Sequence, residues 1–296
     1  MHVLMFFTTL FWAANIVAGK LVLHAMNDMA LAQMRVTCGA ILFVLGFLFW
    51  RGRPALKLTR REWGFLALTA FFGITLNQIF FISGIDRTSA AHSGLIVALG
   101  PVMVLILACA MRLEALTVLK TVGAVVALAG VVVLTAGKEA HSSGATFLGD
   151  ALLFVGGLAF AYYTILLKEV ADRYAALTLN ALVFAMGAIF LLPLSATSLT
   201  RVHWTALPAE AWLGIAFMVI FGTFAAYLFY AFALTELTAS RVAAFAYLQP
   251  VIAAGLGVWL LHESVTWRVV IGGAMILVGV YLAERERGEE ELPAKS

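Results

Sequence analysis

The sequence predicts an all-α integral membrane protein with ten transmembrane helices, arranged as two inverted repeats of five helices. Three observations lead to this prediction: an apolar composition, ten stretches without charged residues, and an internal repeat. Of the 296 residues, 63% are hydrophobic and 12% are charged, and the mean hydropathy is +1.01. Average soluble domains are roughly 45–50% apolar and about 25% charged. The composition therefore excludes soluble enzymes, secreted disulfide scaffolds and disordered regulators.

Each expected helix is a stretch without Lys, Arg, Asp or Glu that, with a flanking residue or two, can cross about 30 Å of hydrocarbon. In chain order the stretches are 1–19, 36–50, 63–85, 88–111, 121–137, 151–167, 174–200, 211–235, 242–262 and 269–283. Short charged connectors such as 51–57 and 168–173 separate them. The apolar runs do not alternate apolar with polar residues, which argues against a transmembrane β-barrel. The first stretch lacks a basic n-region, so we expect it to be helix 1 rather than a cleaved signal peptide.

The basic residues predict the orientation. With ten helices both termini lie on the same side, and thirteen of the 19 Lys and Arg residues fall on that side, against six on the other. Because connectors rich in Lys and Arg remain in the cytoplasm, we expect both termini there, in a bacterial-type inner membrane. The segment 284–296 is expected to be a disordered cytoplasmic tail of mixed charge.

Charge and cysteine content indicate few other partners. The excess of 19 Lys and Arg over 16 Asp and Glu is explained by connectors facing an anionic leaflet, so no nucleic acid is expected. Cys38 and Cys109 lie in apolar runs and are interpreted as small buried hydrophobic residues. We expect no cofactor and no metal; the expected partners are a small-molecule substrate and the lipid bilayer.

An internal repeat is the most informative feature. A shift of 149 residues pairs Pro101 with Pro250, Glu114 with Glu263, Gly123 with Gly272 and Gly130 with Gly279. A shift of 148 pairs Trp12 with Phe160 and Asn15 with Tyr163. The chain is thus expected to hold two five-helix units, 1–140 and 141–283. Since five is odd, the second unit enters the membrane from the opposite side, an architecture typical of alternating-access transporters.

These repeated residues carry a family resemblance. Leu99-Gly-Pro101, Glu114, Gly123 and Gly130, with their second copies at Leu248-Gln-Pro250, Glu263, Gly272 and Gly279, resemble the drug/metabolite transporter superfamily, and within it the EamA-type carriers of ten helices. Trp12-Ala-Ala-Asn15 and Arg35 also fit that pattern. The resemblance covers nearly the whole chain, and its general similarity extends to YddG-type exporters of amino acids. It implies that helices 5 and 10 stand outside the central bundle.

The repeated residues have both functional and structural interpretations. Pro101 and Pro250 are expected to be hinges or breaks facing the translocation path, or else static kinks. Glu114 and Glu263 lie at helix connections, where a role in fixing corners is favoured over ion binding. The glycines allow helices 5 and 10 to approach closely, as a packing surface or as the surface of a homodimer.

Polar and aromatic residues at membrane depth predict the substrate path. Trp12 and Asn15 share one face of helix 1, and a polar side chain at that depth usually faces the bundle interior. The full set is Trp12, Asn15, Asn77, Gln78, Phe81, His92, Tyr163, Tyr227, Tyr230 and Tyr247. It describes a cavity of rings, amides and hydroxyls without a fixed charge, suited to a small amphipathic or aromatic zwitterion. Arg35 and His92 are expected near outer helix ends, either contacting a carboxylate or serving structure. Packing is the competing interpretation for the aromatic residues.

The sequence therefore predicts a secondary transporter that exports amphipathic metabolites, amino acids including aromatic ones first among them. No Asp or Glu lies at a helix centre, which argues against proton-driven cation efflux. Proton-coupled efflux of drugs or other metabolites remains the alternative, and a channel is a further one. An intramembrane hydrolase is disfavoured, because His92 and Ser93 are adjacent and point about 100° apart on a helix. No catalytic residue is expected.

Overall fold

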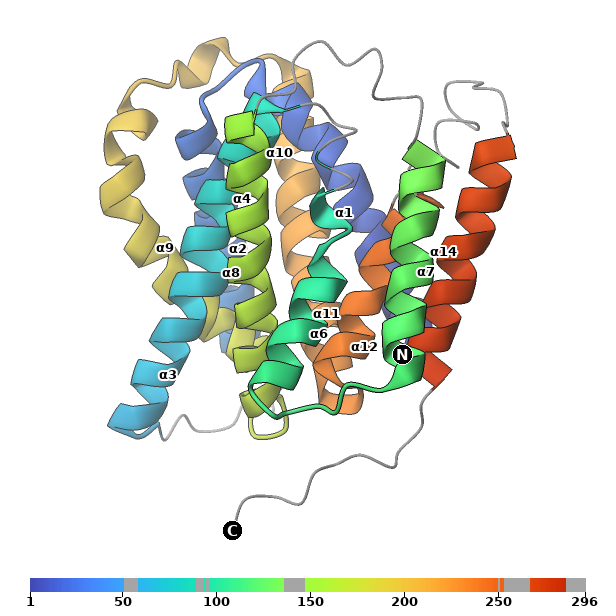
Figure 1. Ribbon diagram of the computed structural model, residues 1–296. Coiled ribbons are helices and arrows are strands. Elements are labelled where there is room, and N and C mark those ends of the chain that lie inside the picture. The colour runs from blue at the N-terminus through green and yellow to red at the C-terminus, as the bar shows by residue number, and fades with distance from the viewer. Residues whose placement is uncertain are drawn as a thin grey trace.

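The computed structural model describes residues 1–50, 58–88, 93, 96–135, 147–249, 251–252 and 267–285 (Figure 1). Within these ranges all regular structure is helical, as predicted. Six helices are long and apolar enough to cross a membrane: His2–Leu23 (α1), Asp28–Phe49 (α2), Arg60–Arg87 (α3, η1 and α4), Phe147–Ala171 (α8), Ala176–Thr200 (α9) and Ala209–Glu236 (α10, η4 and α11). The prediction of a multi-pass helical membrane protein is therefore confirmed.

Shorter helices occupy the other expected positions. They are α6 (Gly100–Ala110), α7 (Val118–Thr135), α12 (Ala239–Ala244) with the 3₁₀ turn η5 (Phe245–Tyr247), and α14 (Trp267–Arg285). The expected tail 284–296 lies, beyond Arg285, outside the described residues. Large apolar side chains within the helices, such as Val125, Ile189 and Leu213, are exposed. That surface suits contact with lipid rather than water.

The helix boundaries follow the repeat found in the sequence. In the first half α3 (Arg60–Ala70) leads into a π-helical turn, η1 (Phe71–Leu76), and then α4 (Asn77–Arg87). In the second half α10 (Ala209–Val219), η4 (Ile220–Ala225) and α11 (Ala226–Glu236) begin and end 149 residues later. Because π turns are rare and often accompany functional sites, their recurrence at one register shows that both halves fold alike.

The two halves interlock instead of forming separate bodies. Extensive contacts join α2 to α9, α4 to α8, and α1 to α10 and α11. Further contacts join α6 to α12 and, most extensively, α7 to α14. Nearly every large helix contact thus pairs one half with the other, which leaves the space between the halves as the natural position for a site.

The repeated glycines hold α7 against α14, which stand side by side at the edge of the molecule (Figure 1). A Cβ atom added to Gly279 would lie 2.5 Å from the backbone nitrogen of Ala127, and one added to Gly123 would lie 2.7 Å from the carbonyl oxygen of Gly279. Gly130 approaches the carbonyl oxygen of Gly272 in the same way, at 2.8 Å. The close approach at Gly123, Gly130 and Gly279 therefore serves the packing of α7 on α14 within the chain.

Two lysines related by the repeat secure the ends of the helices that follow the π turns. Lys20 Nζ donates to the carbonyl oxygens of Ile85 and Thr88, both at 2.8 Å, and Lys168 Nζ donates to that of Leu234, also at 2.8 Å. The last carbonyls of a helix lack partners within the helix, and a cation there also interacts favourably with the helix dipole. Each half thus uses its first helix to cap α4 or α11.

Candidate substrate cavity

A cavity lies between the two halves, lined by residues from α1, α2, α4, α6, α8, α11 and α12. Its volume open to the centre of a water molecule is about 110 Å³. One water needs roughly 10–15 Å³ by this measure, so the cavity can hold several waters or a small solute. Seven residues predicted for the substrate path line it: Trp12, Asn15, Asn77, Gln78, Phe81, Tyr227 and Tyr230.

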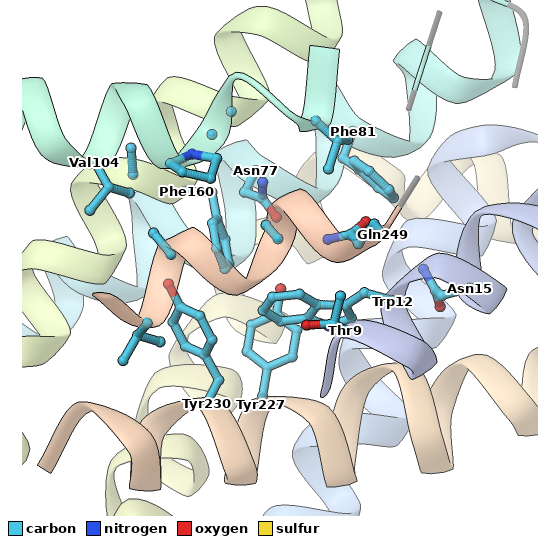
Figure 2. Close-up of a pocket in the computed structure, with 18 of the residues that line it drawn as sticks. Thr9, Trp12, Asn15, Asn77, Phe81, Val104, Phe160, Tyr227, Tyr230 and Gln249 are labelled. Atoms are coloured by element: carbon cyan, nitrogen blue, oxygen red, sulfur yellow. The ribbon is translucent and has the colours of Figure 1, made fainter. Parts of the chain in front are cut away.

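Aromatic rings from three helices form one wall. Trp12 of α1 lies 5.5 Å from Phe160 of α8, 5.7 Å from Tyr227 and 5.2 Å from Tyr230, measured between ring centroids. In Figure 2, Tyr227 and Tyr230 project from α11 toward Trp12. Hydrogen bonds hold two of the rings in place, since Trp12 Nε1 donates to the carbonyl oxygen of Gly222 at 3.2 Å and the Tyr230 hydroxyl bonds Thr164 Oγ1 at 2.7 Å. The wall is therefore preorganised for a flat or amphipathic solute.

Amides supply polar atoms to the same space. Asn77 Nδ2 donates to the carbonyl oxygen of Gly156 at 3.0 Å, and Gln78 Nε2 donates to Asn77 Oδ1 at 3.2 Å and to the Tyr227 hydroxyl at 3.3 Å. Gln78 and Tyr227 are 149 residues apart, so two repeat-related side chains meet here. Asn15 Oδ1 and Gln78 Oε1 are buried without a hydrogen-bond partner in the described part of the chain. A buried polar atom needs a partner, which a bound solute or water can provide.

Arg35 corrects the prediction of a cavity without fixed charge. It lies seven residues into α2, lines the cavity and is 3% exposed. Its Nε donates to Thr223 Oγ1 at 2.8 Å and its Nη2 to the carbonyl oxygen of Gly222 at 3.1 Å, whereas Nη1 has no partner among the residues that the structure describes. The charge-free stretch used to define helix 2 began at residue 36, directly after this side chain. An arginine beside a long apolar run was the signal that could have identified it.

Two predicted residues lie outside the cavity. Tyr163 is fully buried in α8 and packs on Gly73 of η1, where an added Cβ would lie 2.0 Å from its ring carbon Cδ2. Tyr247 lines a second, smaller cavity with Pro101, Lys120 and Ser240. His92, Pro250 and Glu263 lie outside the described residues. Conversely, Thr9, Phe160 and Gln249 line the main cavity, and the repeat alignment of Trp12 with Phe160 was the available signal for Phe160.

Pro101 lies at an interruption of the helix expected over 88–111. It occupies the first turn of α6 and lines both cavities. Before it the backbone forms a turn at Ala98–Leu99, with a hydrogen bond from Leu99 N to the carbonyl oxygen of Ile96 at 3.0 Å. Proline needs no hydrogen-bond acceptor for its nitrogen in a first helical turn. The residue therefore begins a helix beside the cavity and does not distort the middle of one.

Glu114 connects three elements away from the main cavity. Its carboxylate accepts hydrogen bonds from Lys120 Nζ at 3.0 Å, from Ser240 N at 3.1 Å and from Ser240 Oγ. Glu114 and Lys120 are 8% and 7% exposed. The contacts join the connection between α6 and α7 to the beginning of α12. Thr117 Oγ1 accepts from Lys120 N at 3.3 Å at the beginning of α7.

Charged side chains able to hold a metal do not gather anywhere in the described ranges, where no group of three or more His, Cys, Asp or Glu residues occurs. Polar contacts at the helix ends instead join neighbouring elements. One is the hydrogen bond from the Tyr174 hydroxyl to Glu62 Oε1 at 2.6 Å, which raises the pKa of Tyr174.

The chemistry that the described lining of the cavity offers is binding, by aromatic rings, amide oxygens and the guanidinium of Arg35.

Comparison with known proteins agrees with this architecture. The sequence model of the EamA-like transporter family matches residues 1–136 and again 147–284. An "Uncharacterized transporter" of Archaeoglobus fulgidus is 30% identical over 282 residues, which are 95% of this chain and 96% of the relative. The "Uncharacterized transporter YetK" of Bacillus subtilis is 23% identical over 91% of this chain and 82% of its own. A solved structure titled "Crystal structure of protein", 18% identical, superimposes with a TM-score of 0.75 over 95% of both chains, which shows a shared fold.

Proposed function

The chain belongs to the EamA-like transporter family of the drug/metabolite transporter superfamily, and on that premise we propose that it is a secondary transporter that exports small amphipathic metabolites by alternating access. Amino acids, including aromatic ones, are the first substrates to test, as for YddG-type exporters. The observation that carries the proposal is the cavity between the halves, where an aromatic wall meets amide oxygens that have no partner among the described residues. As a member of this family, the chain is a membrane transporter and not an enzyme.

The duplicated architecture supports alternating access. We propose ten transmembrane helices in two repeats, 1–140 and 141–283, inserted in opposite directions and followed by the cytoplasmic tail 284–296. In such an arrangement, exchange of conformation between the halves opens a central site first to one side and then to the other. This exchange requires helices to bend. The candidate positions are the π turns η1 and η4 and the beginning of α6, where Pro101 lies. The sequence holds no Gly-rich phosphate-binding loop with Lys, so transport is proposed to be secondary.

A counterflow assay tests the substrate class. Purified protein is reconstituted in liposomes loaded with unlabelled amino acids, nucleosides, sugars or cationic dyes, and uptake of the labelled compound is followed with and without a pH gradient. We expect saturable counterflow with amphipathic amino acids, aromatic ones most strongly. Dye transport driven only by the pH gradient would favour proton-coupled drug efflux, and unsaturable flux would favour a channel.

Truncation of the central amide should impair transport. Gln78→Ala removes the contacts of Gln78 Nε2 with Asn77 and Tyr227 and also the unpartnered Oε1. We expect flux per folded protein to fall about tenfold, which corresponds to the loss of a hydrogen bond worth about 1.4 kcal/mol. Tyr227→Ala should behave similarly. Proteoliposome uptake normalised to monodisperse protein is the measurement.

The control for Gln78→Ala is Gln33→Ala, which truncates another buried amide. Gln33 bonds Thr37, Ser195 and the carbonyl oxygen of Ala188 and does not line the cavity. Its variant should lose stability but keep its flux per folded protein. Flux at the wild-type level in both Gln78→Ala and Tyr227→Ala would refute the proposed path.

The proposed orientation predicts which positions label from which side. In a background with Cys38 and Cys109 replaced by alanine, single cysteines are introduced at Ala55 and Glu290, and at Thr205 for the opposite side. A membrane-impermeant maleimide applied to intact cells should label only the cysteine at position 205. Labelling of position 55 or 290 from outside would reverse the orientation.

A further inference from the structure

We infer that Arg35 is the anion-binding residue of this cavity, so that the preferred substrates are carboxylates with an apolar or aromatic body, and an amino group is optional. The inference deepens the proposed function and rests on it, since it assumes that the cavity is the transport site. Its basis is a guanidinium that is 3% exposed, lines the cavity and has an Nη1 without a partner among the described residues.

The protein itself does not neutralise this charge in the part of the chain that the structure describes. The partners of Arg35 there are a hydroxyl, Thr223 Oγ1, and a backbone carbonyl, that of Gly222. No described Asp or Glu lines the cavity or forms an ion pair with Arg35. A buried charge without an opposite charge is costly, particularly at membrane depth. An anion entering the cavity would remove that cost, which gives carboxylates an advantage that neutral or cationic solutes lack.

One edge of the guanidinium has no hydrogen-bond partner among the described residues. Its Nε and Nη2 both bond η4, so the edge that they form is occupied by the protein. Nη1 and the second hydrogen of Nη2 form the other edge, and two parallel N–H groups match the two oxygens of a carboxylate. The described residues therefore hold the arginine by one edge and leave the other without a hydrogen-bond partner, in a side chain that lines the cavity.

The aromatic wall begins beside this cation. The carbonyl oxygen of Gly222 accepts both from Arg35 Nη2 at 3.1 Å and from Trp12 Nε1 at 3.2 Å. A carboxylate on Arg35 would consequently have its attached carbon chain next to the Trp12 ring and, beyond it, Tyr227 and Phe160. This juxtaposition suits an acid group separated from an aromatic or apolar body by a short linker.

The rest of the lining explains why an amino group is optional. An ammonium group would find the amide oxygen Gln78 Oε1, which has no partner among the described residues, but no described carboxylate. Neutral amide oxygens accept from ammonium, from neutral amines or from water alike. The charge of the cavity thus selects the acid group, and the amides tolerate rather than require the amino group.

Matched probes separate this role from a purely structural one. Binding is measured by thermal stabilisation of the detergent-solubilised protein, and transport by competition in proteoliposomes. The probes are 3-phenylpropionate, its isosteric amide 3-phenylpropionamide, phenylalanine, phenylalaninamide and phenethylamine. For the wild type we expect each acid to bind at least tenfold more tightly than its amide, and phenethylamine to bind weakest. In Arg35→Gln the ratio of acid to amide should collapse to about one, while Arg201→Gln, at an exposed arginine outside the cavity, keeps it.

The outcomes distinguish the two proposals. Equal binding of acids and amides by the wild type, or a preserved acid preference in Arg35→Gln, would overturn the role of Arg35 even if amino acids are transported. Absence of saturable counterflow for every compound would instead overturn the proposed function, while the binding ratios still report on Arg35. If Arg35→Gln does not fold, the ratio of acid to amide binding is measured in Arg35→Lys instead. Lysine keeps the charge and loses the fork, so the acid preference should be reduced but present, and an acid preference equal to that of the wild type overturns the bidentate contact.

Discussion

Gly73→Ala will destabilise the protein by about 1–3 kcal/mol, because the added methyl group has no space. Its Cβ would lie 2.0 Å from Cδ2 and 2.3 Å from Cγ of Tyr163. The Tyr163 ring is fully buried and packs against Phe160, with ring centroids 5.5 Å apart, so it can yield only if α8 shifts. Thermal unfolding in detergent, together with the monodisperse fraction after size exclusion, measures the effect.

Two companion variants make that result specific. Nothing lies within 4 Å of a Cβ added to Gly64, so Gly64→Ala should be neutral or stabilise by about 0.5–1 kcal/mol through helix propensity. Tyr163→Ala should relieve the clash, so the double variant with Gly73→Ala should be little worse than Tyr163→Ala alone. Unfolding of Gly73→Ala at the wild-type temperature would contradict the close packing.

The repeat gives Gly73 a counterpart whose variant should be milder. Gly222 of η4 receives Asn15, whose Oδ1 would lie 2.3 Å from an added Cβ. Asn15 and Tyr163 are themselves related by the repeat, so the first helix of each half presses a side chain into the π turn of the other half. An amide at the end of a flexible side chain can rotate away more easily than a buried ring. These two contacts, each between a side chain and a π turn, hold together the helices that line the cavity.

Glu114→Gln will cost about 3–5 kcal/mol of stability, the range for breaking a buried ion pair by removing one partner. The substitution leaves Lys120 charged and buried, and it weakens the contacts with Ser240 at the beginning of α12. We expect a fall of several degrees in the unfolding temperature and a lower folded yield.

A double variant and an exposed control test the assignment of Glu114. Lys120→Met in the Glu114→Gln background removes the uncompensated charge and should recover part of the loss. Glu236→Gln, at an exposed acid at the end of α11, should change the unfolding temperature by less than one degree. If Glu114→Gln melts like the control, the buried pair does not stabilise this corner.

Much of the architecture could be read from local sequence. The scarcity of charge located the helices, since a spanning segment must be helical and apolar over its whole length. The 149-residue register of the repeat is also the offset between α3–η1–α4 and α10–η4–α11, although the π turns themselves were not predicted. Amides at membrane depth, above all Asn77 and Gln78, indicated the cavity, because polar groups there must face the interior.

Tertiary structure alone decided which face of each helix meets the cavity. Tyr163 and Tyr227 are both buried aromatic residues of the second half, yet one packs into η1 and the other lines the cavity. Arg35 reaches the cavity only because α2 packs against η4, a contact across almost 190 residues of chain. These helices are apolar on all sides, so they lack the polar face that orients a helix in a soluble protein. Composition and register therefore determined the helices and their duplication, whereas the inward faces, and the place of Arg35 among the described residues that line the cavity, depend on long-range packing.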